Sequence, residues 1–374
     1  MRISNLKLKN FRNYRSLEAD LDFAFVAFVG NNGQGKTNLL EAINIAATGS
    51  SFRYGNNSDF ILNSSDGPAR IELSFQKEQL DYKVQCEIDS NKKHFFLNTK
   101  KATAGDVSKL IPLTLFCPES LAAIKESGEH RRKLVDDALF ILDKGYYDDL
   151  SRFSRTLKAR NKILKDLLEG RIGITSANDL LDSIDPSYLE SSFLVADKRI
   201  KLLRKIVPDL SNLMAEIFFE DAVDISVEYL VSGENLLNTD SNNLRYLIEK
   251  RLREMRGAEI AAGRSLVGPQ KHDIKFLYNG NDSRFFCSQG QQRSLILAFK
   301  LAQIVYHGRA YGSYPILMLD DVLSELDLGR RGKFLSILRG LETQILITTT
   351  EIHSSSILKD LQLKVFNVSK GTLN

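Results

Sequence analysis

The sequence predicts an α/β fold, a mixed sheet with helices, into which a helical arm domain is inserted. Three observations lead to this prediction. A glycine-rich loop follows a continuous apolar segment and precedes a segment with helical periodicity. A second apolar segment, far downstream, ends in two aspartates. Between them, from about residue 119 to residue 219, apolar residues recur at the spacing of a helix rather than that of a strand.

The composition is that of a soluble globular protein. The 374 residues are 43% hydrophobic and 26% charged, which suits one large domain or two modest ones. The net charge of +4 allows a polyanionic partner where the charges are unevenly arranged. No apolar run reaches membrane-spanning length, the N-terminus lacks a signal-peptide core, and Cys86, Cys117 and Cys287 lack metal-ligand spacing. We therefore expect a cytoplasmic protein with reduced thiols and no membrane partner.

The glycine-rich loop has the pattern of a phosphate-binding loop. It consists of Gly30, Asn31, Asn32, Gly33, Gln34, Gly35, Lys36 and Thr37. Phe23–Val29 is expected to form a buried strand before it, and a helix is expected after it. Glycines let backbone N–H groups approach phosphates, and the helix N-terminus adds its positive dipole end. We expect the loop to bind ATP, with Lys36 on the outer phosphates and Thr37 as a ligand of Mg²⁺. The alternative is a glycine-rich turn without a ligand.

Pro315–Leu319 is the second expected buried strand, and Asp320 and Asp321 follow it. Parallel strands bring their carboxyl ends to one sheet edge, so these carboxylates should lie beside the phosphate loop. We expect Asp320 to bind Mg²⁺ and Asp321 to orient or deprotonate the attacking water. Asp321 and Lys36 are therefore the expected catalytic residues. The alternative is that the two carboxylates cap the next helix.

Ser288–Arg293 and Ser324–Asp327 complete the pattern of an ABC-type P-loop ATPase head. Ser288–Arg293 precedes the strand Pro315–Leu319 and resembles a signature loop. Ser324–Asp327 follows that strand and resembles the D-loop of the same class. In this class the signature loop of one subunit covers the ATP of another. Ser288, Gly290 and Gln291 are therefore expected to act across a homodimer interface that depends on ATP. The alternative for Ser288 is an ordinary helix N-cap.

Hydrolysis is expected to be slow. Transport ATPases of this class usually carry a switch histidine after the strand that corresponds to Ile345–Thr349. Here Thr350 follows that strand, and His353 lies three residues further on. We therefore expect Thr350 to sense the γ-phosphate.

The remaining periodicity divides the chain. Further strands are expected at Arg2–Lys9, Arg70–Phe75, Asp81–Ile88, Ile225–Val231, Ile274–Tyr278 and Arg284–Cys287, and a helix at Ser294–Val305. We expect residues 1–117 and 221–374 to form one discontinuous ATPase head, and residues 118–220 to form the inserted helical arm.

The arm carries a basic stripe. Seven Lys or Arg residues lie between Ser151 and Arg171, against two acidic residues. One helical face is lined by Arg155, Lys158, Lys162 and Lys165, which are the first candidates for DNA contact. Lys198, Arg199 and Lys201 are the next candidates. A solvated helix face is the equally well supported alternative.

Several segments resemble the RecF family, within the SMC-like ABC ATPases. They are Leu8–Tyr14, Phe116 with Pro118, Glu119 and Leu121, Arg131–Arg132, Gly268–Pro269, Ser288–Arg293 and Leu319–Asp327. The resemblance covers nearly the whole chain and is poorest from 140 to 250. Two positions depart from the family pattern: Gln270 stands in place of a histidine, and Ser120 in place of an aspartate. Neither departure touches the nucleotide loops.

The resemblance implies a recombination mediator with weak, DNA-stimulated ATPase activity. Such a protein binds single- and double-stranded DNA, gaps and junctions in an ATP-dependent way. It works with RecO and RecR to load the recombinase RecA in gap repair, replication-fork recovery and SOS induction, and it associates with the nucleoid. Arg12, in the first resembling segment, is expected to contact the nucleotide; the alternative is a surface arginine.

Three other functions compete with this one. An SMC-like chromosome-organising head would need a longer insertion for its coiled arm. A transporter ATPase subunit would need a membrane partner and normally the switch histidine. The third is a nucleotide-gated scaffold with negligible turnover, against which the intact pair Asp320 and Asp321 argues mildly.

Overall fold

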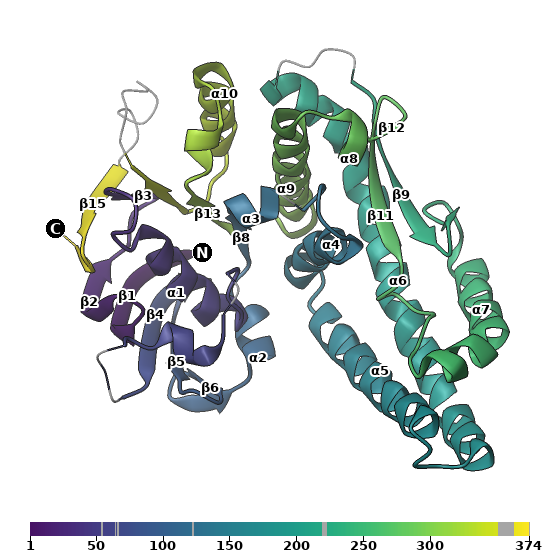
Figure 1. The fold of residues 1–374 in the computed structure, drawn as a ribbon. Helices are drawn as coiled ribbons and strands as arrows, with labels where there is room; N and C mark the ends of the chain where they lie inside the picture. The colour runs from purple at the N-terminus through teal and green to yellow at the C-terminus, as the bar shows by residue number, and fades with distance from the viewer. Residues whose placement is uncertain are drawn as a thin grey trace. The chain divides into compact units, whose positions relative to one another are not determined.

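The computed structural model describes residues 1–53, 55–63, 65, 67–121, 123–218, 223–350 and 363–373 (Figure 1). Its contacts divide the chain into two compact units. The head unit comprises Met1–Ala122, Leu213–Asp221 and Arg293–Asn374, and the arm unit comprises Ala123–Asn212 and Ala222–Gln292. In the ranges above, none of the helices combines the length and apolar character needed to cross a bilayer.

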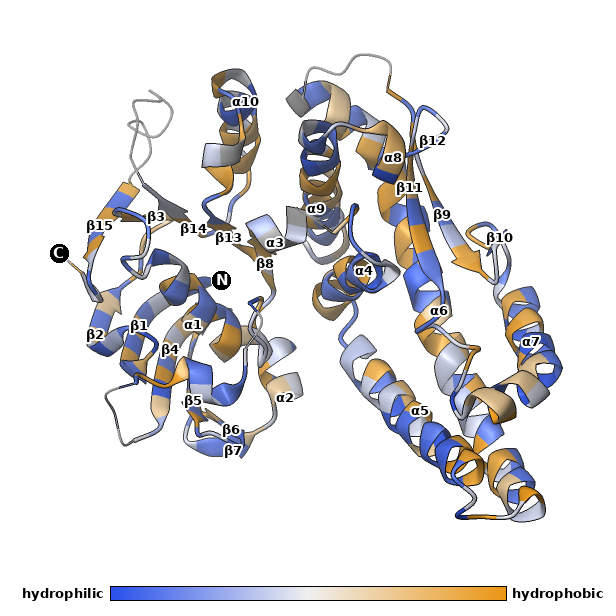
Figure 2. Cartoon of the chain, in the orientation of Figure 1, coloured by the Kyte–Doolittle hydropathy of each residue, from blue (hydrophilic) through white to orange (hydrophobic). Residues whose placement is uncertain are grey.

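The head unit contains a six-stranded sheet whose central strands are parallel. Its order is β16 (Thr372–Leu373), β15 (Leu363–Ser369), β3 (Phe25–Val29), β14 (Ile345–Thr349), β13 (Ile316–Asp320) and β8 (Leu113–Phe116). β3, β13 and β14 are apolar and buried along nearly their whole length, as is typical of strands covered on both faces; β13 is orange in Figure 2. The register sets Leu317 opposite Ile345 and Ile345 opposite Phe25, so the carboxyl ends of these strands meet at one edge.

The second sheet of the head is antiparallel. Its order is β2 (Tyr14–Asp20), β1 (Arg2–Phe11), β4 (Ala69–Lys77), β5 (Leu80–Ile88), β6 (Lys93–Leu97) and β7 (Lys100–Ala102). Buried and exposed side chains alternate along β4, so one face packs inward and the other faces solvent. Helix α1 (Lys36–Thr48) lies between the two sheets, because it contacts β1, β4 and β5 and also β8, β13 and β14.

Other elements complete the head. Most of α9 (Gln289–Tyr311) belongs to it, as does α10 (Leu328–Arg339), and both meet the Phe116 ring of β8. The Phe334 ring lies edge-on to Phe116 at 5.8 Å, and the Lys300 ammonium is 5.8 Å from the centre of the same ring. The short helical elements are η1 (Asn57–Phe60), α2 (Ala104–Ser108), α3 (Pro118–Leu121) and η2 (Val322–Glu325).

The arm unit combines long helices with a small sheet. Its helices are α4 (Gly128–Leu142), α5 (Tyr146–Leu168), α6 (Ile174–Phe218), which belongs to the arm up to Asn212, α7 (Ser241–Ala262) and α8 (Ser283–Phe286). The sheet order is β10 (Glu234–Asn235), β9 (Ile225–Val231), β11 (Asp273–Tyr278) and β12 (Asn281–Asp282). The fully buried guanidinium of Arg160 joins three helices, since it donates at 2.7 Å to Asp185 of α6 and at 2.7 Å to Glu259 of α7.

The compact units do not follow the expected boundary at residue 220. Residues 222–292, which we expected to rejoin the head, lie in the arm unit. The physical reason is that β9 and β11 pair with each other, while β11 packs on α4 and α7 packs on α5. Arg131 of α4 strengthens this packing, since its Nη2 donates to both carboxylate oxygens of Asp273, at 2.8 and 2.9 Å.

Arg284–Cys287 was expected as a strand, but Arg284 to Phe286 are helical and only Cys287 is extended. Asp282 caps α8 by accepting a hydrogen bond from the Arg284 N–H at 3.0 Å, which favours a helical turn over extended backbone. The apolar residues that suggested a strand are not core residues: Phe285 is 76% exposed and Phe286 is 70% exposed.

His272 is enclosed in the arm. Its Nδ1 lies 2.9 Å from the Tyr229 hydroxyl, and the side chain is buried. Burial, with smaller contributions from the charges of Arg199 and Arg132, lowers the pKa of His272 to about 3 from the ordinary 6.5. The folded chain therefore keeps this imidazole neutral where an unfolded chain would protonate it.

We predict that the free energy of unfolding decreases as the pH falls below 6.5, because only the unfolded chain binds a proton at His272 until the pH nears 3. One such group costs about 1.4 kcal/mol per pH unit in that interval. In urea unfolding between about pH 7.5 and pH 5, the free energy of unfolding below pH 6.5 should fall more steeply for the wild type than for His272→Gln, by close to this amount. Equal slopes for the two proteins would contradict the prediction.

Candidate functional site

The phosphate loop has the predicted strand–loop–helix context. It leaves β3 at Val29 and enters α1 at Lys36. Gly33 and Gly35 have φ values of 79° and 114°, which side chains disfavour. A Cβ on Gly30 would come within 2.3 Å of the Val368 carbonyl oxygen of β15. Both the conformation and the packing of the loop therefore require glycine.

Lys36 folds back over its own loop. Its Nζ donates to the carbonyl oxygens of Gly30 at 2.7 Å and Asn31 at 3.0 Å, and the residue is 6% exposed. Burial lowers the pKa of Lys36, while the nearby carboxylates of Asp321 and Asp320 oppose that shift. The ammonium thus lies at the loop, close to both aspartates predicted from the sequence.

Asp320 ends β13 beside the phosphate loop. Its Oδ1 accepts a hydrogen bond from Thr37 Oγ1 at 2.9 Å and another from Thr348 Oγ1 of β14 at 2.7 Å. Hydroxyl and carboxylate oxygens are the ligands that Mg²⁺ prefers. The pair Thr37 and Asp320, predicted as metal ligands, is therefore brought together with the right donor atoms.

Asp321 has an unusual backbone. Its φ of 51° is left-handed, and its N–H donates to Thr348 Oγ1 at 2.9 Å. One carboxylate oxygen, Oδ1, is buried and has no hydrogen-bond partner among the described residues. Strained backbone and an unsatisfied buried oxygen are features that concentrate at functional sites.

The end of β14 also lies beside the phosphate loop. The Thr349 carbonyl accepts a hydrogen bond from the Gly30 N–H at 3.3 Å, and the half-buried Thr350 follows directly. His353 lies outside the described residues, so the comparison between Thr350 and a switch histidine stays a prediction.

Two residues that sequence reasoning missed hold the loop from the side of β1. The Asn13 amide donates to the Gln34 carbonyl at 2.9 Å, and the Tyr14 hydroxyl donates to the Gly35 carbonyl at 3.1 Å. The Asn38 amide in turn donates to Asn13 Oδ1 at 2.8 Å. Asn13 and Tyr14 belong to the segment that carried the family resemblance, which was the available signal.

Arg12 is tied to α1. Its Nε and Nη2 donate to the buried carboxylate of Glu41 at 2.9 and 2.8 Å, and Nη1 donates to the Asp59 carbonyl at 2.9 Å. All three guanidinium nitrogens are thus engaged, and a nucleotide contact by Arg12 stays a prediction. Arg53, which the sequence did not single out, donates to Asn38 Oδ1 at 3.0 Å beside the first turn of α1.

The signature loop lies in the arm unit, at the start of α9. Ser288 Oγ accepts from the Gln291 N–H at 3.2 Å, and Gln291 Oε1 accepts from the Ser288 N–H at 2.9 Å. This reciprocal pair is a capping box, so the N-cap alternative holds as a description of local structure. Ser288 and Gly290 are exposed in the single chain. The loop is therefore both ordered and accessible.

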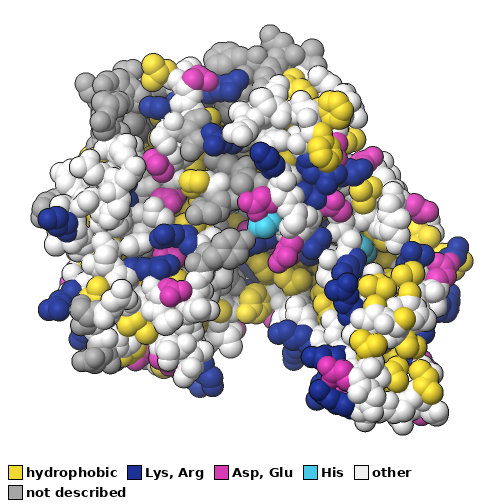
Figure 3. Space-filling view, in the orientation of Figure 1, with side chains coloured by type: hydrophobic (Ala, Val, Ile, Leu, Met, Phe, Trp, Pro, Cys, Tyr) yellow, Lys and Arg dark blue, Asp and Glu magenta, His cyan; other side chains and the backbone are white. Residues whose placement is uncertain are grey.

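The basic stripe runs along α5. Arg155, Lys158 and Lys162 are exposed, with no ion pair among the described residues, whereas Lys165 is 3.7 Å from Glu169. Figure 3 shows Lys and Arg side chains gathered in this part of the arm.

The second group of DNA candidates is already paired. Lys198 contacts Asp143 and Asp149, and Lys201 contacts Asp197. Arg199 is 4% exposed and bonded to Asp136. These three side chains are occupied within the arm, which argues against them as DNA contacts.

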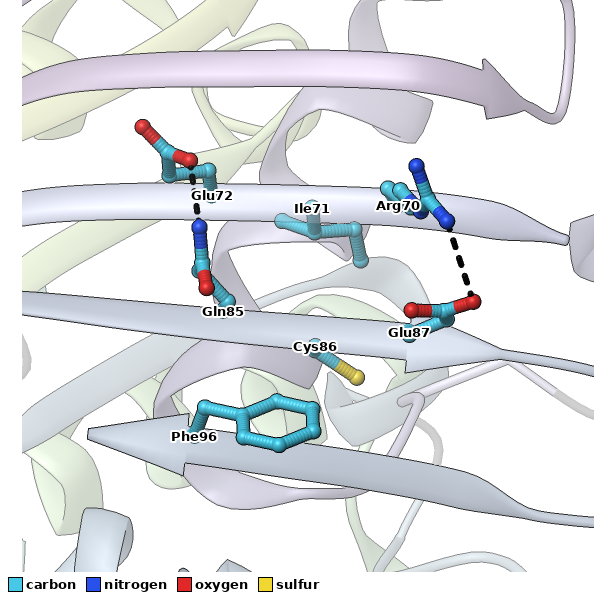
Figure 4. Close-up of a pocket in the computed structure, with 7 residues that line it drawn as sticks. All are labelled: Arg70, Ile71, Glu72, Gln85, Cys86, Glu87 and Phe96. Carbon is cyan, nitrogen blue, oxygen red and sulfur yellow. Dashed lines mark hydrogen bonds and ion pairs between the residues drawn. The ribbon is translucent and has the colours of Figure 1, made fainter. Parts of the chain in front are cut away.

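A depression on the antiparallel sheet of the head is separate from these groups. Figure 4 shows it lined by Arg70, Ile71, Glu72, Gln85, Cys86, Glu87 and Phe96. Its polar side chains satisfy one another: Gln85 donates to Glu72 at 2.8 Å, and Arg70 donates to Glu87 at 3.3 Å. None of the predicted site residues lines it.

Comparisons with known proteins agree with this geometry. A family model for the RecF/RecN/SMC N terminal domain matches residues 2–374. The DNA replication and repair protein RecF of Heliobacterium modesticaldum is 33% identical over 386 residues, which cover 100% of this chain and 99% of that protein. The protein of the same name from Clostridium novyi is 33% identical over 376 residues, which cover 100% of both chains.

Solved structures show the same relationship. One described as the recombination mediator protein RecF-ATP in the RecFOR pathway has a TM-score of 0.87 and 29% identity, covering 100% of this chain and 97% of that one. An Smc head domain from Pyrococcus furiosus has a TM-score of 0.57 at 15% identity and covers 100% of this chain and 95% of that one, a likeness of fold alone.

The fold and the site define an ABC-type P-loop ATPase head with a helical arm inserted. Residues 30–37 have the strand–loop–helix geometry of that class, and Thr37 of this loop is bonded to Asp320 at the end of β13. The chain belongs to the RecF family, within the RecF/RecN/SMC group.

Proposed function

We propose that this chain is a DNA repair and replication ATPase that binds ATP with Mg²⁺ at residues 30–37 and closes as a dimer on DNA. The observation that carries the proposal is the hydrogen bond between Thr37 and Asp320, which joins the phosphate loop to the carboxylates of β13. The solved RecF-ATP relative supports ATP as the nucleotide.

The site residues divide the chemistry among them. Lys36, now bonded to loop carbonyls, exchanges those bonds for contacts to the outer phosphates. Thr37 and Asp320 hold Mg²⁺, which when bound neutralises charge on phosphate oxygens. Asp321 has a carboxylate oxygen, unpartnered within the described residues, with which to orient the attacking water or accept its proton. Thr350 senses the γ-phosphate, and turnover is slow.

A second copy completes the site. Ser288, Gly290 and Gln291 of one chain cover the ATP held by the other, as the exposed and ordered signature loop allows. ATP bound between two heads stabilises the dimer by linkage, so association depends on nucleotide.

DNA binds chiefly through phosphate contacts. The exposed cations Arg155, Lys158 and Lys162, with Lys165, supply a stripe of positive charge on α5. By analogy with the family, the substrates are single- and double-stranded DNA, gaps and junctions, and RecR and RecO are partners in gap repair, fork recovery and SOS induction.

Lys36→Met is expected to abolish ATP binding, because it removes the cation of the phosphate loop. Isothermal titration should show no heat of binding at concentrations that saturate the wild type. Lys77→Met is the matched control, since the Lys77 ammonium also donates to a carbonyl of the head, that of Leu110. Unchanged affinity in Lys36→Met would contradict the assignment of the site.

Ser288→Arg is expected to leave ATP binding by the single chain intact and to block dimerisation, because a long cation replaces the residue that faces the partner's ATP. Size-exclusion chromatography with and without ATP measures this. Ser127→Arg is the control, since Ser127 is another exposed N-cap serine of the arm. If Ser288→Arg dimerises like the wild type, the composite site is wrong.

The chain contains its own reporter for this experiment. Cys287 adjoins the signature loop and is partly exposed, whereas Cys86 and Cys117 are buried. Burial also raises the pKa of Cys86 to about 12, which suppresses its reactivity. Alkylation of Cys287 should slow on addition of ATP in the wild type and not in Ser288→Arg.

Reversal of charge at Arg155, Lys158 and Lys162 to Glu is expected to weaken DNA binding without changing ATP affinity. The slope of log affinity against log salt should fall by close to one for each duplex phosphate that the variant no longer neutralises. Fluorescence anisotropy with a gapped duplex measures both quantities.

The control reverses Lys201, Lys250 and Arg253, which are exposed but already ion-paired within one helical turn. It changes the net charge by the same amount. If both triple variants bind DNA equally, the stripe is only a solvated helix face.

A further inference from the structure

The C-terminal hairpin runs alongside the phosphate loop. β15 pairs in parallel with β3 up to Asn367 opposite Val29, so this pairing ends level with the start of the loop and β15 continues beside the loop to Ser369 (Figure 1). The chain then reverses into β16, with Ser369 paired to Thr372. Lys370 and Gly371 between them have φ values of 45° and 77°. Two successive left-handed residues are the geometry of a tight type I′ hairpin.

This turn binds one residue of the phosphate loop twice. The Lys370 N–H donates to the Gln34 side-chain oxygen at 2.8 Å, and the Gly371 N–H donates to the Gln34 carbonyl at 3.3 Å. The same carbonyl accepts the Asn13 amide at 2.9 Å. Gln34 is therefore held from the C-terminal turn and from the end of β1 together.

The surrounding backbone leaves little room for adjustment. A Cβ on Gly371 would come within 2.3 Å of the Asn13 carbonyl oxygen. On the other side of the loop, a Cβ on Gly30 would meet the Val368 carbonyl oxygen at the same 2.3 Å. The hairpin thus approaches both Asn13 and the loop to the limit of contact, with no side chain between.

We propose that the Ser369–Gly371 turn sets the affinity of the phosphate loop for ATP, and that Gln34 is the positioning residue through which it acts. The loop binds phosphates with backbone N–H groups, whose directions depend on the conformation of Asn31–Gly35. By fixing Gln34, the turn holds these donors in place before the nucleotide arrives, which lowers the ordering cost of binding. This inference rests on the proposed function and adds a means by which the C-terminus controls that site.

Two variants break the contact from opposite sides. Gln34→Met keeps the length of the side chain but removes the acceptor for the Lys370 N–H. Gly371→Ala pushes the turn away from Asn13. Each should weaken ATP binding roughly three- to tenfold, the effect of one hydrogen bond. Because both variants loosen the attachment of the same turn to Gln34, the double variant should bind ATP at most about twofold more weakly than the weaker-binding single variant.

The control is Gly312→Ala. Gly312 also lies in the head and has a φ of 65°, but apart from Gly312 and its two chain neighbours no atom of the described residues lies within 4 Å of the place that the alanine methyl would take. The alanine there carries a similar backbone strain and should lower the melting temperature without changing ATP affinity. In steady-state hydrolysis, Gly371→Ala should raise KM and leave kcat near the wild-type value, a split that general destabilisation does not produce.

The titrations distinguish a failure of this inference from a failure of the proposed function. If the wild type itself does not bind ATP in titration calorimetry, the proposed function fails. If the wild type binds and Gly371→Ala binds equally well, the turn has no influence and this inference is overturned. If Gln34→Met and Gly371→Ala weaken binding multiplicatively in the double variant, Gln34 acts independently of the turn, which also overturns it.

Discussion

The hydrogen bond between Thr37 and Asp320 depends on the order of the parallel sheet, and the rest of the site depends on that bond. It joins residues separated by 283 positions, at a distance of 2.9 Å. β14 lies between β3 and β13, and its Thr348 bonds both the Asp320 carboxylate and the Asp321 N–H. Three adjacent strands in register therefore bring together the Thr37 hydroxyl and the Asp320 carboxylate, the oxygens that we propose bind Mg²⁺. An arm inserted between the two motifs leaves this arrangement intact, because the sheet closes without it.

A second constraint is the close packing of backbone around the phosphate loop. Gly30 lies against β15, and Gly35 lies against Asn13 and Tyr14. These glycines are usually explained by access for phosphates; here they also admit neighbouring backbone and side chains from the head itself. A loop held in this way loses less conformational entropy when a ligand binds. Lys36 completes the preorganisation, since its bonds to loop carbonyls keep the ammonium at the place where phosphates would arrive.

Sequence patterns predicted the parts of the molecule with strong local signals. The strands before Gly30 and Asp320 are continuous apolar runs, and the loop between strand and helix has an eight-residue pattern, so both were found. Contacts between distant segments gave no such signal. The residues around Glu41 do not indicate that its carboxylate accepts a hydrogen bond from Arg12. The residues around Lys370 do not indicate that its N–H donates to the Gln34 side chain. The strands β9 and β11 alternate like the head strands, yet their pairing with each other and the packing of β11 on α4 assign them to the arm. The prediction of a strand at Arg284–Cys287 was wrong because the hydrogen bond that caps α8 at Asp282 outweighed the apolar composition of the segment.

The capping box at Ser288 bears on how two copies could associate. From the sequence, an N-cap role and a partner-facing role of Ser288 are alternatives. In the structure the two are compatible, because the N-cap hydrogen bonds order the loop that we propose faces the partner. The Gln291 side chain accepts a hydrogen bond from the Ser288 N–H and donates one to the Tyr278 hydroxyl. The Gln292 side chain donates to the Ser283 carbonyl, so hydrogen bonds within the chain fix the backbone around Gly290. The exposed helix N-terminus that results directs N–H groups outward, where a phosphate is favoured. Under the proposed dimerisation, this loop is already ordered before the two chains associate, so more of the free energy from the phosphate contacts stabilises the dimer.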